Sequence, residues 1–488
     1  MGSSPRSTWL CAALGFAGSM LVAYAAPRAV PDPVVHWWYV PAAPAGRPVS
    51  LVLVYVGMAA LTGAWLALGR SLPSRRGLIV ICAAWAIPLT IVPPLFSRDV
   101  YSYLAQGTIL HLGHNPYRTA PSALAGLGRE HVLAAVSPFW RGTTAPYGPL
   151  FLELISVVVG VVGSNLVAGV LLTRGLELLG LVLLAVSLPR LTRALGSDGR
   201  RGLWLGMLSP LVMLQLIAPG HNDLLMAGLL AAGVAVALDG QPLIGIAICA
   251  LAATIKLPAL AGAVFIAVAW GRAERGTADR VRFVVTAALV VTAILGAVTL
   301  IAGVGVSWIS TSLLSTPAKV RLAVTPATGV GYTVASLLHD AGIATSARGW
   351  ESAFAAVGIA LTALIGLVLA ARVTIARVVA LLGAFLLLAA AAGPATWPWY
   401  FIWGLALIAA LASAQRSTAL AVAIAVSAFV VKPNGILALP LRFAPGIVIL
   451  YAVLLAGWWV RRDRGDHETP TPGARPVRES TPSALAGS

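Results

Sequence analysis

Apolar runs long enough to cross a lipid bilayer recur along almost the whole chain of 488 residues. A membrane-spanning helix needs roughly 20 consecutive apolar residues. Hydrophobic residues make up 59% of this sequence and charged residues only 10%, whereas a soluble domain is about 25% charged. We therefore predict an all-α polytopic membrane protein, with a single transmembrane domain over residues 1–462.

The number of spans depends on two regions. The first run, Trp9–Ala26, ends in a cleavage-like Ala25-Ala26-Pro27, so a signal peptide is the alternative to the uncleaved span that we favour. Residues 149–189 contain two apolar runs broken near Gly163-Ser-Asn165, which leaves the total at about 13–16 spans. The other spans are expected at 50–69, 77–95, 202–219, 224–239, 242–255, 257–270, 281–304, 351–371, 378–393, 398–414, 417–431 and 443–460.

The net charge of +17 comes from arginines in the short segments between apolar runs, such as Arg75 and Arg200. Positive charge beside spans marks the cytoplasmic side of a membrane protein, so topology explains the basic balance and nucleic-acid binding is excluded. This topology places two long loops, 97–148 and 305–349, on the outer side. The tail 463–488, rich in Pro, Ser, Thr and charge, is predicted to be cytoplasmic and disordered.

The two outer loops are each expected to contain a helix. An amphipathic stretch covers residues 100–112, and a second, interfacial helix is expected at 329–340. The three cysteines lie in apolar runs without the spacing of metal ligands, so we expect core residues rather than a disulfide framework.

Asp99 has the most distinctive surroundings of the 16 carboxylates. It follows an apolar run directly, in the segment Phe96-Ser-Arg-Asp-Val-Tyr-Ser-Tyr-Leu-Ala-Gln-Gly107. A carboxylate beside lipid is costly and usually functional. Asp99 could be an ordinary helix N-cap with Arg98 as a surface partner. The functional hypothesis is a general base that takes a proton from an acceptor hydroxyl.

The segment Pro219-Gly-His-Asn-Asp223 joins two expected spans on the outer side. Gly, Asn and Asp suit a plain helical hairpin turn, but His, Asn and Asp together also suit recognition of a phosphate or a sugar. Lys256 lies between two apolar runs, in Thr254-Ile-Lys-Leu-Pro258. It could snorkel to the interface or bind a lipid-linked phosphate.

Two further groups of residues have a structural and a functional interpretation. Arg174 and Glu177 lie three residues apart on one helix face, where an intrahelical ion pair is the default and a supporting role at the site is the alternative. Trp397-Pro-Trp-Tyr400 with Trp403 is most simply an interfacial aromatic belt, with stacking on a sugar or prenyl chain as the minority interpretation.

The sequence resembles the polyprenol-phosphate-mannose-dependent α-1,6-mannosyltransferases of lipomannan and lipoarabinomannan synthesis, in order from about residue 50 to 460. The likeness is closer to the type that elongates the mannan backbone than to the type that begins it. The motifs that carry the resemblance are the 96–107 segment, Asn115-Pro-Tyr117, Thr143-Thr-Ala-Pro-Tyr-Gly-Pro149, Gly220-His-Asn222, Pro398-Trp-Tyr400 and Lys432-Pro-Asn-Gly435.

The resemblance implies a GT-C-type bundle in the plasma membrane, with its active site on the extracytoplasmic face and Asp99 as the catalytic base. The donor would be a polyprenyl-phosphate-mannose and the acceptor a lipid-linked mannan, joined by an α-1,6 linkage with inversion. Expected substrate-binding residues are Arg98, Tyr101, Tyr103, Gln106, Asn115, Tyr117, Tyr147, His221, Asn222 and Asp223. Expected phosphate-binding residues are Lys256, Arg174 and Lys432, with His221 as a further candidate.

The sequence leaves open whether a metal binds and whether the protein is an enzyme or a transporter. No cofactor is indicated, although a divalent metal could bind if Asp99 and Asp223 meet in space. The competing class is a polytopic transporter or lipid flippase, and a GT-C enzyme with another polyprenyl-phosphate sugar is a second alternative. Transporters tend to show repeat symmetry and ionisable residues near the bilayer midplane. This chain concentrates its polar residues in outer loops, which favours an enzyme.

Overall fold

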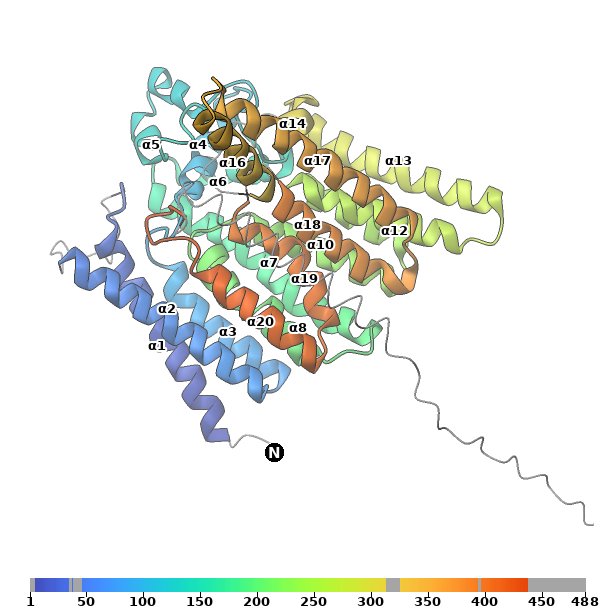
Figure 1. The fold of residues 1–488 in the computed structure, drawn as a ribbon, viewed down its shortest axis with the longest axis horizontal. Helices are drawn as coiled ribbons and strands as arrows, with labels where there is room; N and C mark the ends of the chain where they lie inside the picture. Colours follow the sequence, from blue (N-terminus) through green and yellow to red (C-terminus); the bar gives the residue numbers. More distant parts are fainter. Residues whose placement is uncertain (1–4, 35–36, 38–45, 313–324, 394–395, 438–488) are drawn as a thin grey trace, which may run out of the picture.

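The computed structural model describes residues 5–34, 37, 46–312, 325–393 and 396–437. This part of the chain is a bundle of helices and contains no β-strand (Figure 1). The α-helices in these residues are α1 (Pro5–Ala29), α2 (Arg47–Arg70), α3 (Arg75–Thr90), α4 (Asp99–His111), α5 (Glu130–Ala135), α6 (Pro149–Val162), α7 (Leu166–Ala194), α8 (Gly199–Gly206), α9 (Pro210–Val212), α10 (Asp223–Leu238), α11 (Pro242–Ala253), α12 (Leu260–Ala273), α13 (Thr277–Ile301), α14 (Ser307–Ser310), α16 (Pro326–Asp340), α17 (Ala347–Ala371), α18 (Val378–Ala392), α19 (Ile402–Ile408) and α20 (Ala414–Ala428).

Long apolar helices confirm the all-α polytopic class. Within the described ranges, six are long and apolar enough to cross a membrane: α1, α2, α7, α13, α17 and the continuous stretch Ile375–Ala392 that contains α18. Shorter apolar helices of 10–17 residues, such as α6, α10 and α11, fill the space between them. The exposed apolar faces of α13 and α17 suit contact with lipid. The total number of crossings stays a prediction.

The break expected near Gly163 is present. α6 ends at Val162, Gly163 has a φ of 60°, and the side chain of Asn165 accepts a hydrogen bond from the Ala168 N–H at 3.1 Å to cap α7. A left-handed φ is easily adopted only by glycine. Two separate helices therefore follow the 97–148 loop.

The single span expected at 202–219 is wrong. The chain there forms α8, the short α9 and a π-helical turn, Met213–Ile217. Pro210 cannot continue a helix from the preceding turn, and the Ser209 hydroxyl caps the new start by accepting from the Val212 N–H at 3.4 Å. The interruption brings the loop around His221 into the interior of the bundle, where it is fully buried.

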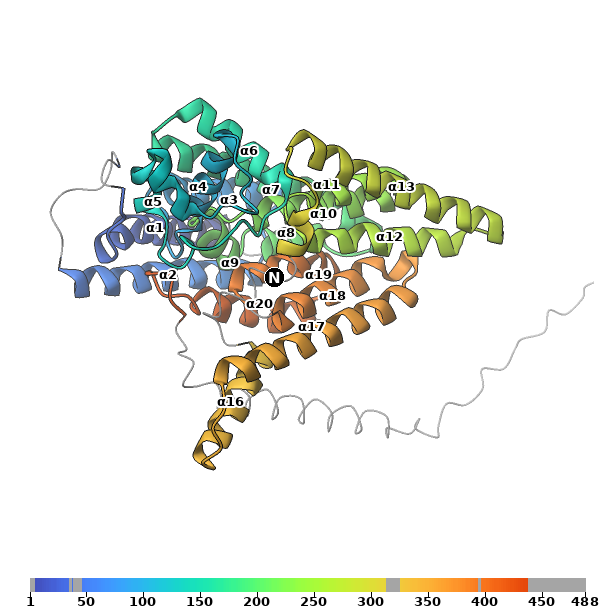
Figure 2. The ribbon, with the colours of Figure 1, turned by 90° about the horizontal axis from the view of Figure 1, so that it is seen from above.

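The helix expected at 100–112 is present as α4, but it is not amphipathic. Every residue from Val100 to Ile109 is buried, because α4 packs against α6 and α7. The helix expected at 329–340 is present as α16, which packs on the first part of α17 and projects away from the rest of the bundle (Figure 2). The span 443–460, the tail 463–488 and part of the loop 305–349 lie outside the described residues.

Glycines allow α7 and α10 to pack very closely. A Cβ at Gly180 would lie 2.3 Å from the Leu224 carbonyl oxygen, and one at Gly228 would lie 2.4 Å from the Gly180 carbonyl oxygen. No side chain fits at such distances. This contact holds the start of α10 against the middle of α7, which positions the His221–Asp223 segment.

Candidate active site

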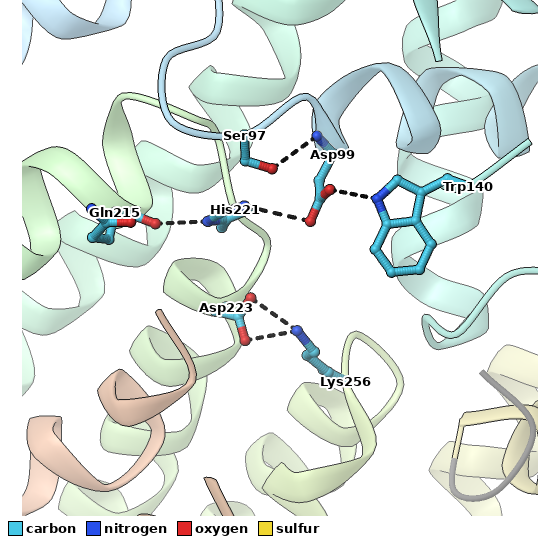
Figure 3. Close-up of polar contacts among 7 residues, drawn as sticks. All are labelled: Ser97, Asp99, Trp140, Gln215, His221, Asp223 and Lys256. Carbon is cyan, nitrogen blue, oxygen red and sulfur yellow. Dashed lines mark hydrogen bonds and ion pairs between the residues drawn. The ribbon is translucent and has the colours of Figure 1, made fainter. Parts of the chain in front are cut away.

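Asp99 is the first residue of α4. Phe96 enters this turn with a φ of 63°, a strained value for a non-glycine residue, and the Ser97 hydroxyl accepts a hydrogen bond from the Asp99 N–H at 3.1 Å. Arg98 occupies the cap position, and no side chain caps the helix. The N-cap alternative for Asp99 is therefore wrong, and its carboxylate points into the site instead (Figure 3).

The Asp99 carboxylate has two side-chain partners (Figure 3). The Trp140 Nε1–H donates to Oδ1 at 2.8 Å, and the His221 Nε2 atom lies 3.5 Å from Oδ2. Burial alone raises the pKa of Asp99, but hydrogen bonding and charge from His221, with hydrogen bonds from Trp140 and Ser97, outweigh it and lower the pKa below the ordinary 3.8. Asp99 is therefore ionised at neutral pH.

His221 bridges Asp99 to the backbone. Its Nδ1 atom lies 2.6 Å from the Gln215 carbonyl oxygen, which can only accept a hydrogen bond, so Nδ1 carries a hydrogen. A neutral ring would then turn the Nε2 lone pair toward the carboxylate, whereas an imidazolium directs an N–H donor to each partner. The ring also packs on Trp399, with centroids 4.0 Å apart. The ring is thereby fixed between the Gln215 carbonyl and the Asp99 carboxylate.

A second charged pair lies beside the first (Figure 3). Lys256 Nζ lies 2.7 and 2.9 Å from the two carboxylate oxygens of Asp223, and Trp403 Nε1–H donates to the same carboxylate at 2.6 Å. The Tyr400 ring lies 4.5 Å below the ammonium group. An ammonium has three N–H donors, so Lys256 keeps one donor for a ligand after pairing with Asp223.

Two cavities meet at Asp99. The larger, of about 360 Å³, is mostly apolar and includes Lys256 in its wall. The smaller, of about 170 Å³, is bordered by loop segments. The residues that line both are Asp99, Trp140, Trp397 and Trp399.

The structure gathers only part of the expected site. The expected residues that line a cavity, or that bond to its wall, are Arg98, Asp99, Tyr103, Tyr147, His221, Asp223 and Lys256. Asn222 lies beside them, fully buried, and neither of its amide atoms has a partner among the described residues. The expected residues that lie outside both cavities are Tyr101, Gln106, Asn115, Tyr117, Arg174 and Lys432.

Most of these outlying residues hydrogen-bond to the protein. The Tyr101 hydroxyl donates to the Asp32 carboxylate at 2.7 Å, and the Tyr117 hydroxyl donates to the Tyr147 carbonyl at 2.7 Å. The Asn115 amide donates to the Val304 carbonyl at 2.8 Å. Gln106 is buried, and Lys432 is exposed in a turn next to the smaller cavity.

Arg174 and Glu177 do not form the ion pair expected by default. The Arg174 guanidinium donates instead to the carbonyls of Thr90, Val92 and Ala218, while the Glu177 carboxylate accepts from the Leu225 N–H at 3.4 Å. The carbonyl groups at the end of a helix lack an N–H partner within that helix. The Arg174 guanidinium donates hydrogen bonds to such carbonyls here. Arg174 thereby ties the segment before Asp99 to the segment before His221.

The interpretation of the aromatic residues at 397–403 as an interfacial belt is wrong. Trp399 packs on His221, Trp403 binds Asp223, and both line the larger cavity with Trp397 and Tyr400. Composition favoured the membrane surface for this cluster, because tryptophan and tyrosine are enriched there. Trp140 and the Gln215 carbonyl were missed altogether, because neither lies near Asp99 or His221 in a recognisable pattern.

The Thr143–Pro149 segment docks on the Lys256 turn. The Gly148 N–H donates to the Ile255 carbonyl at 2.9 Å, and the Leu150 N–H donates to the Thr254 carbonyl at 3.0 Å. A Cβ at Gly148 would lie 2.1 Å from the Thr254 carbonyl oxygen. Only glycine allows this approach, which aligns Tyr147 and Lys256 on one cavity wall.

The described part of the chain contains no group of three or more His, Cys, Asp or Glu residues that could hold a metal ion. Asp223, the second carboxylate of the metal hypothesis, is paired with Lys256. Cys82 and Cys249 are buried and free, and Cys11 is free and half-buried, as expected for core residues.

The fold and the site define a multi-pass helical membrane protein with an ionised carboxylate beside an apolar cavity. The chain matches the sequence family described as alpha-(1->6)-mannopyranosyltransferase, N-terminal domain, over residues 11–272. It therefore belongs to that family and is a membrane glycosyltransferase.

Curated relatives extend this similarity over most of the chain. It is 34% identical to alpha-(1->6)-mannopyranosyltransferase A of Mycobacterium tuberculosis, over 80% of this chain and 77% of the relative. It is 32% identical to a probable alpha-(1->6)-mannopyranosyltransferase of Mycolicibacterium smegmatis, over 89% of this chain and 84% of the relative. It is 28% identical to alpha-(1->6)-mannopyranosyltransferase B of Corynebacterium glutamicum, over 94% and 83%. No solved structure matches the chain.

Proposed function

We propose that this protein transfers mannose from polyprenyl-phosphate-mannose to a lipid-linked mannan acceptor and forms an α-1,6 linkage with inversion. It elongates the lipomannan and lipoarabinomannan backbone at the extracytoplasmic face of the plasma membrane. The relatives' names supply the sugar and the linkage. The observation that carries the mechanism is the ionised Asp99 carboxylate, at the junction of two cavities and next to Lys256.

Asp99 acts as the general base. The acceptor 6-hydroxyl donates a hydrogen bond to the Asp99 carboxylate, and its oxygen attacks C1 of the donor mannose from the face opposite the phosphate. The new C1–O bond forms as the bond from C1 to the phosphate oxygen breaks, and that oxygen keeps the electron pair. The hydroxyl proton passes to Asp99. Attack from the opposite face converts a β-linked donor into an α-linked product.

A carboxylate with a lowered pKa is a weak base for a resting alcohol. It becomes adequate late in the reaction, because the attacking hydroxyl turns strongly acidic as its oxygen bonds to C1. A phosphate leaves without protonation, so one carboxylate suffices and the acid–base pair typical of glycosidases is not needed. Lys256 offsets the charge that develops on the phosphate.

The larger cavity supports the proposed class of donor. Its lining is dominated by apolar side chains and includes one ammonium group, from Lys256. A lipid-linked phosphate needs both features, whereas a nucleotide sugar needs polar partners for its base and ribose. This distribution favours a polyprenyl-phosphate donor.

The test uses the purified full-length protein in lipid vesicles, with radiolabelled polyprenyl-phosphate-mannose and a short α-1,6-mannoside. We expect labelled product that an α-1,6-specific mannosidase degrades. If only another polyprenyl-phosphate sugar transfers its label, that sugar is the donor and the proposal of a mannose donor is wrong. Movement of the lipid across the vesicle without product would support a flippase and overturn the proposed function.

A further inference from the structure

The two cavities that meet at Asp99 have walls of different origin. We propose that the smaller cavity is the subsite for the terminal mannose of the acceptor, while the larger one holds the donor. This inference rests on the proposed function and assigns its two substrates to opposite sides of one carboxylate. Asp99, Trp140, Trp397 and Trp399 line both cavities, so a group in either one reaches the same base.

One wall of the larger cavity comes from two membrane helices, α17 and α18. α17 contributes Ile359, Thr362 and Ala363, and α18 contributes Phe385 and Ala389. α17 is poorly covered by protein, with Leu361 53% exposed and Leu364 57% exposed beside the lining residues. A prenyl chain in the bilayer would therefore meet this helix on its lipid-facing side, next to the residues that line the cavity.

The walls of the smaller cavity come from four short segments, which are loops apart from the first residue of α4 and the start of the 3-10 turn Pro398–Phe401. These are residues 97–99, 137–140, 397–399 and 435–437. The turn at Gly435 packs on the first of these segments, where a Cβ would lie 3.1 Å from the Phe96 carbonyl oxygen. A cavity bordered by loops opens toward water rather than toward lipid chains, which is where a soluble mannan chain would approach.

The lining of the smaller cavity suits a sugar. It presents the hydroxyls of Ser97 and Ser137 and the Arg98 guanidinium, next to the rings of Trp140 and Trp399. The Arg98 guanidinium donates one N–H to the Pro31 carbonyl at 3.0 Å and has four other N–H donors. Aromatic faces with a few hydrogen-bonding groups are the usual composition of a site for a polar ring.

The size of the smaller cavity limits what it can hold. At about 170 Å³ it is about half the volume of the larger one, at about 360 Å³. Sites for drug-sized ligands measure about 300–1,000 Å³, so the smaller cavity suits a single sugar ring rather than a chain. We infer that the enzyme recognises the non-reducing terminal mannose and leaves the rest of the acceptor in solution.

Two matched substitutions test this assignment. Ile436 lines only the smaller cavity and is 55% exposed, whereas Ala363 lines only the larger cavity and is also exposed. A tryptophan at either position fills cavity space without entering the protein core. The KM values for acceptor and donor are measured separately for Ile436→Trp and Ala363→Trp, after both variants match the wild type in thermal stability.

We expect Ile436→Trp to raise the acceptor KM about 10-fold or more and to leave the donor KM unchanged. Ala363→Trp should raise the donor KM and spare the acceptor KM. A donor effect from Ile436→Trp, or no effect from it on either KM, would overturn the subsite assignment while mannose transfer by the wild type still stands. A wild type that makes no product would instead refute the proposed function, and the assignment with it.

Discussion

The Nε2 atom of His221 lies 3.5 Å from Oδ2 of Asp99, while the other nitrogen of the same ring is held by a backbone carbonyl. Both residues come from interrupted segments of the bundle, one at the start of α4 and one after a π-helical turn. Their contact keeps the Asp99 carboxylate ionised despite its burial, since His221 is the largest of the influences that lower its pKa.

The pH dependence of transfer should follow from this contact. The lowered pKa keeps Asp99 ionised from neutral pH down to below 3.8, so its protonation should cause no loss of kcat/KM above that pH. In His221→Gln the contribution of burial remains and those of His221 are lost, so the pKa of Asp99 should rise. The acid limb of the kcat/KM profile should move toward neutral pH in that variant.

The same shift bears on stability. The folded-state pKa of Asp99 lies below its unfolded value of 3.8, so the group contributes stability above pH 3.8, and the contribution is lost as the pH falls through the lowered pKa. An unmoved acid limb in His221→Gln, with unchanged melting temperature, would contradict the role that we give to the contact.

Lys256 and Asp223 should be separable by a double substitution. Lys256→Met alone leaves a buried, unpaired Asp223 carboxylate, which typically costs about 3–5 kcal/mol of folding free energy. Lys256→Met with Asp223→Leu removes both charges and should recover most of the thermal stability. The double variant should still bind the donor poorly, because the phosphate has lost its cation. A double variant with a wild-type donor KM would exclude Lys256 from phosphate binding.

Arg174 should act as a positioning residue. It ties the backbone before Asp99 to the backbone before His221, but it lines neither cavity. Arg174→Met should lower kcat with little change in either KM, because it disturbs the geometry of the base rather than a substrate contact. Arg174→Lys should recover only part of kcat, since an ammonium lacks the planar fork that reaches several carbonyls.

The effect of Arg174→Met should extend to the pH profile, because misplacement of His221 raises the pKa of Asp99. Equal losses of folded protein and activity, with an unchanged pH profile in the remaining enzyme, would reduce Arg174 to a general structural role.

Gly148 should not tolerate a side chain. A methyl group there would meet the Thr254 carbonyl at 2.1 Å, so Gly148→Ala must push the Lys256 turn away. Overpacking of this kind costs about 1–3 kcal/mol, and the donor KM should rise as Lys256 moves. Gly142→Ala is the matched control in the same loop, because a Cβ there meets nothing within 4 Å. Thermal unfolding and the donor KM are measured for both variants. Equal values for Gly148→Ala and Gly142→Ala would contradict the role given to this close contact.

The fold class was predictable because lipid imposes one strong rule, namely that long apolar runs become helices. α2, α10 and α17 begin and end close to their expected limits. The interruption at Ser209–Pro210 was not predicted, since its neighbours are as apolar as those of a continuous helix. Asp99 could be singled out because a carboxylate at the end of an apolar run has few ordinary explanations.

The partners of Asp99 were harder to predict. Trp140 and Trp399 lie 41 and 300 residues along the chain from Asp99, and composition alone assigned the tryptophans at 397–403 to the membrane surface. The sequence predicted an ion pair between Arg174 and Glu177, because the two residues lie on one face of the same helix. In the structure Arg174 binds carbonyls at the ends of interrupted helices, and Glu177 binds the Leu225 N–H in α10.

The most direct test of the account is single-turnover mannose transfer by Asp99→Asn, compared with the wild type and with Glu130→Gln, an exposed carboxamide control in the same outer loop. Asparagine keeps the shape of the side chain but cannot accept the proton. We expect Asp99→Asn to transfer mannose about 10²–10⁴ times more slowly, with the donor still bound, and Glu130→Gln to match the wild type. Transfer by Asp99→Asn at the wild-type rate would contradict the claim that Asp99 is the base.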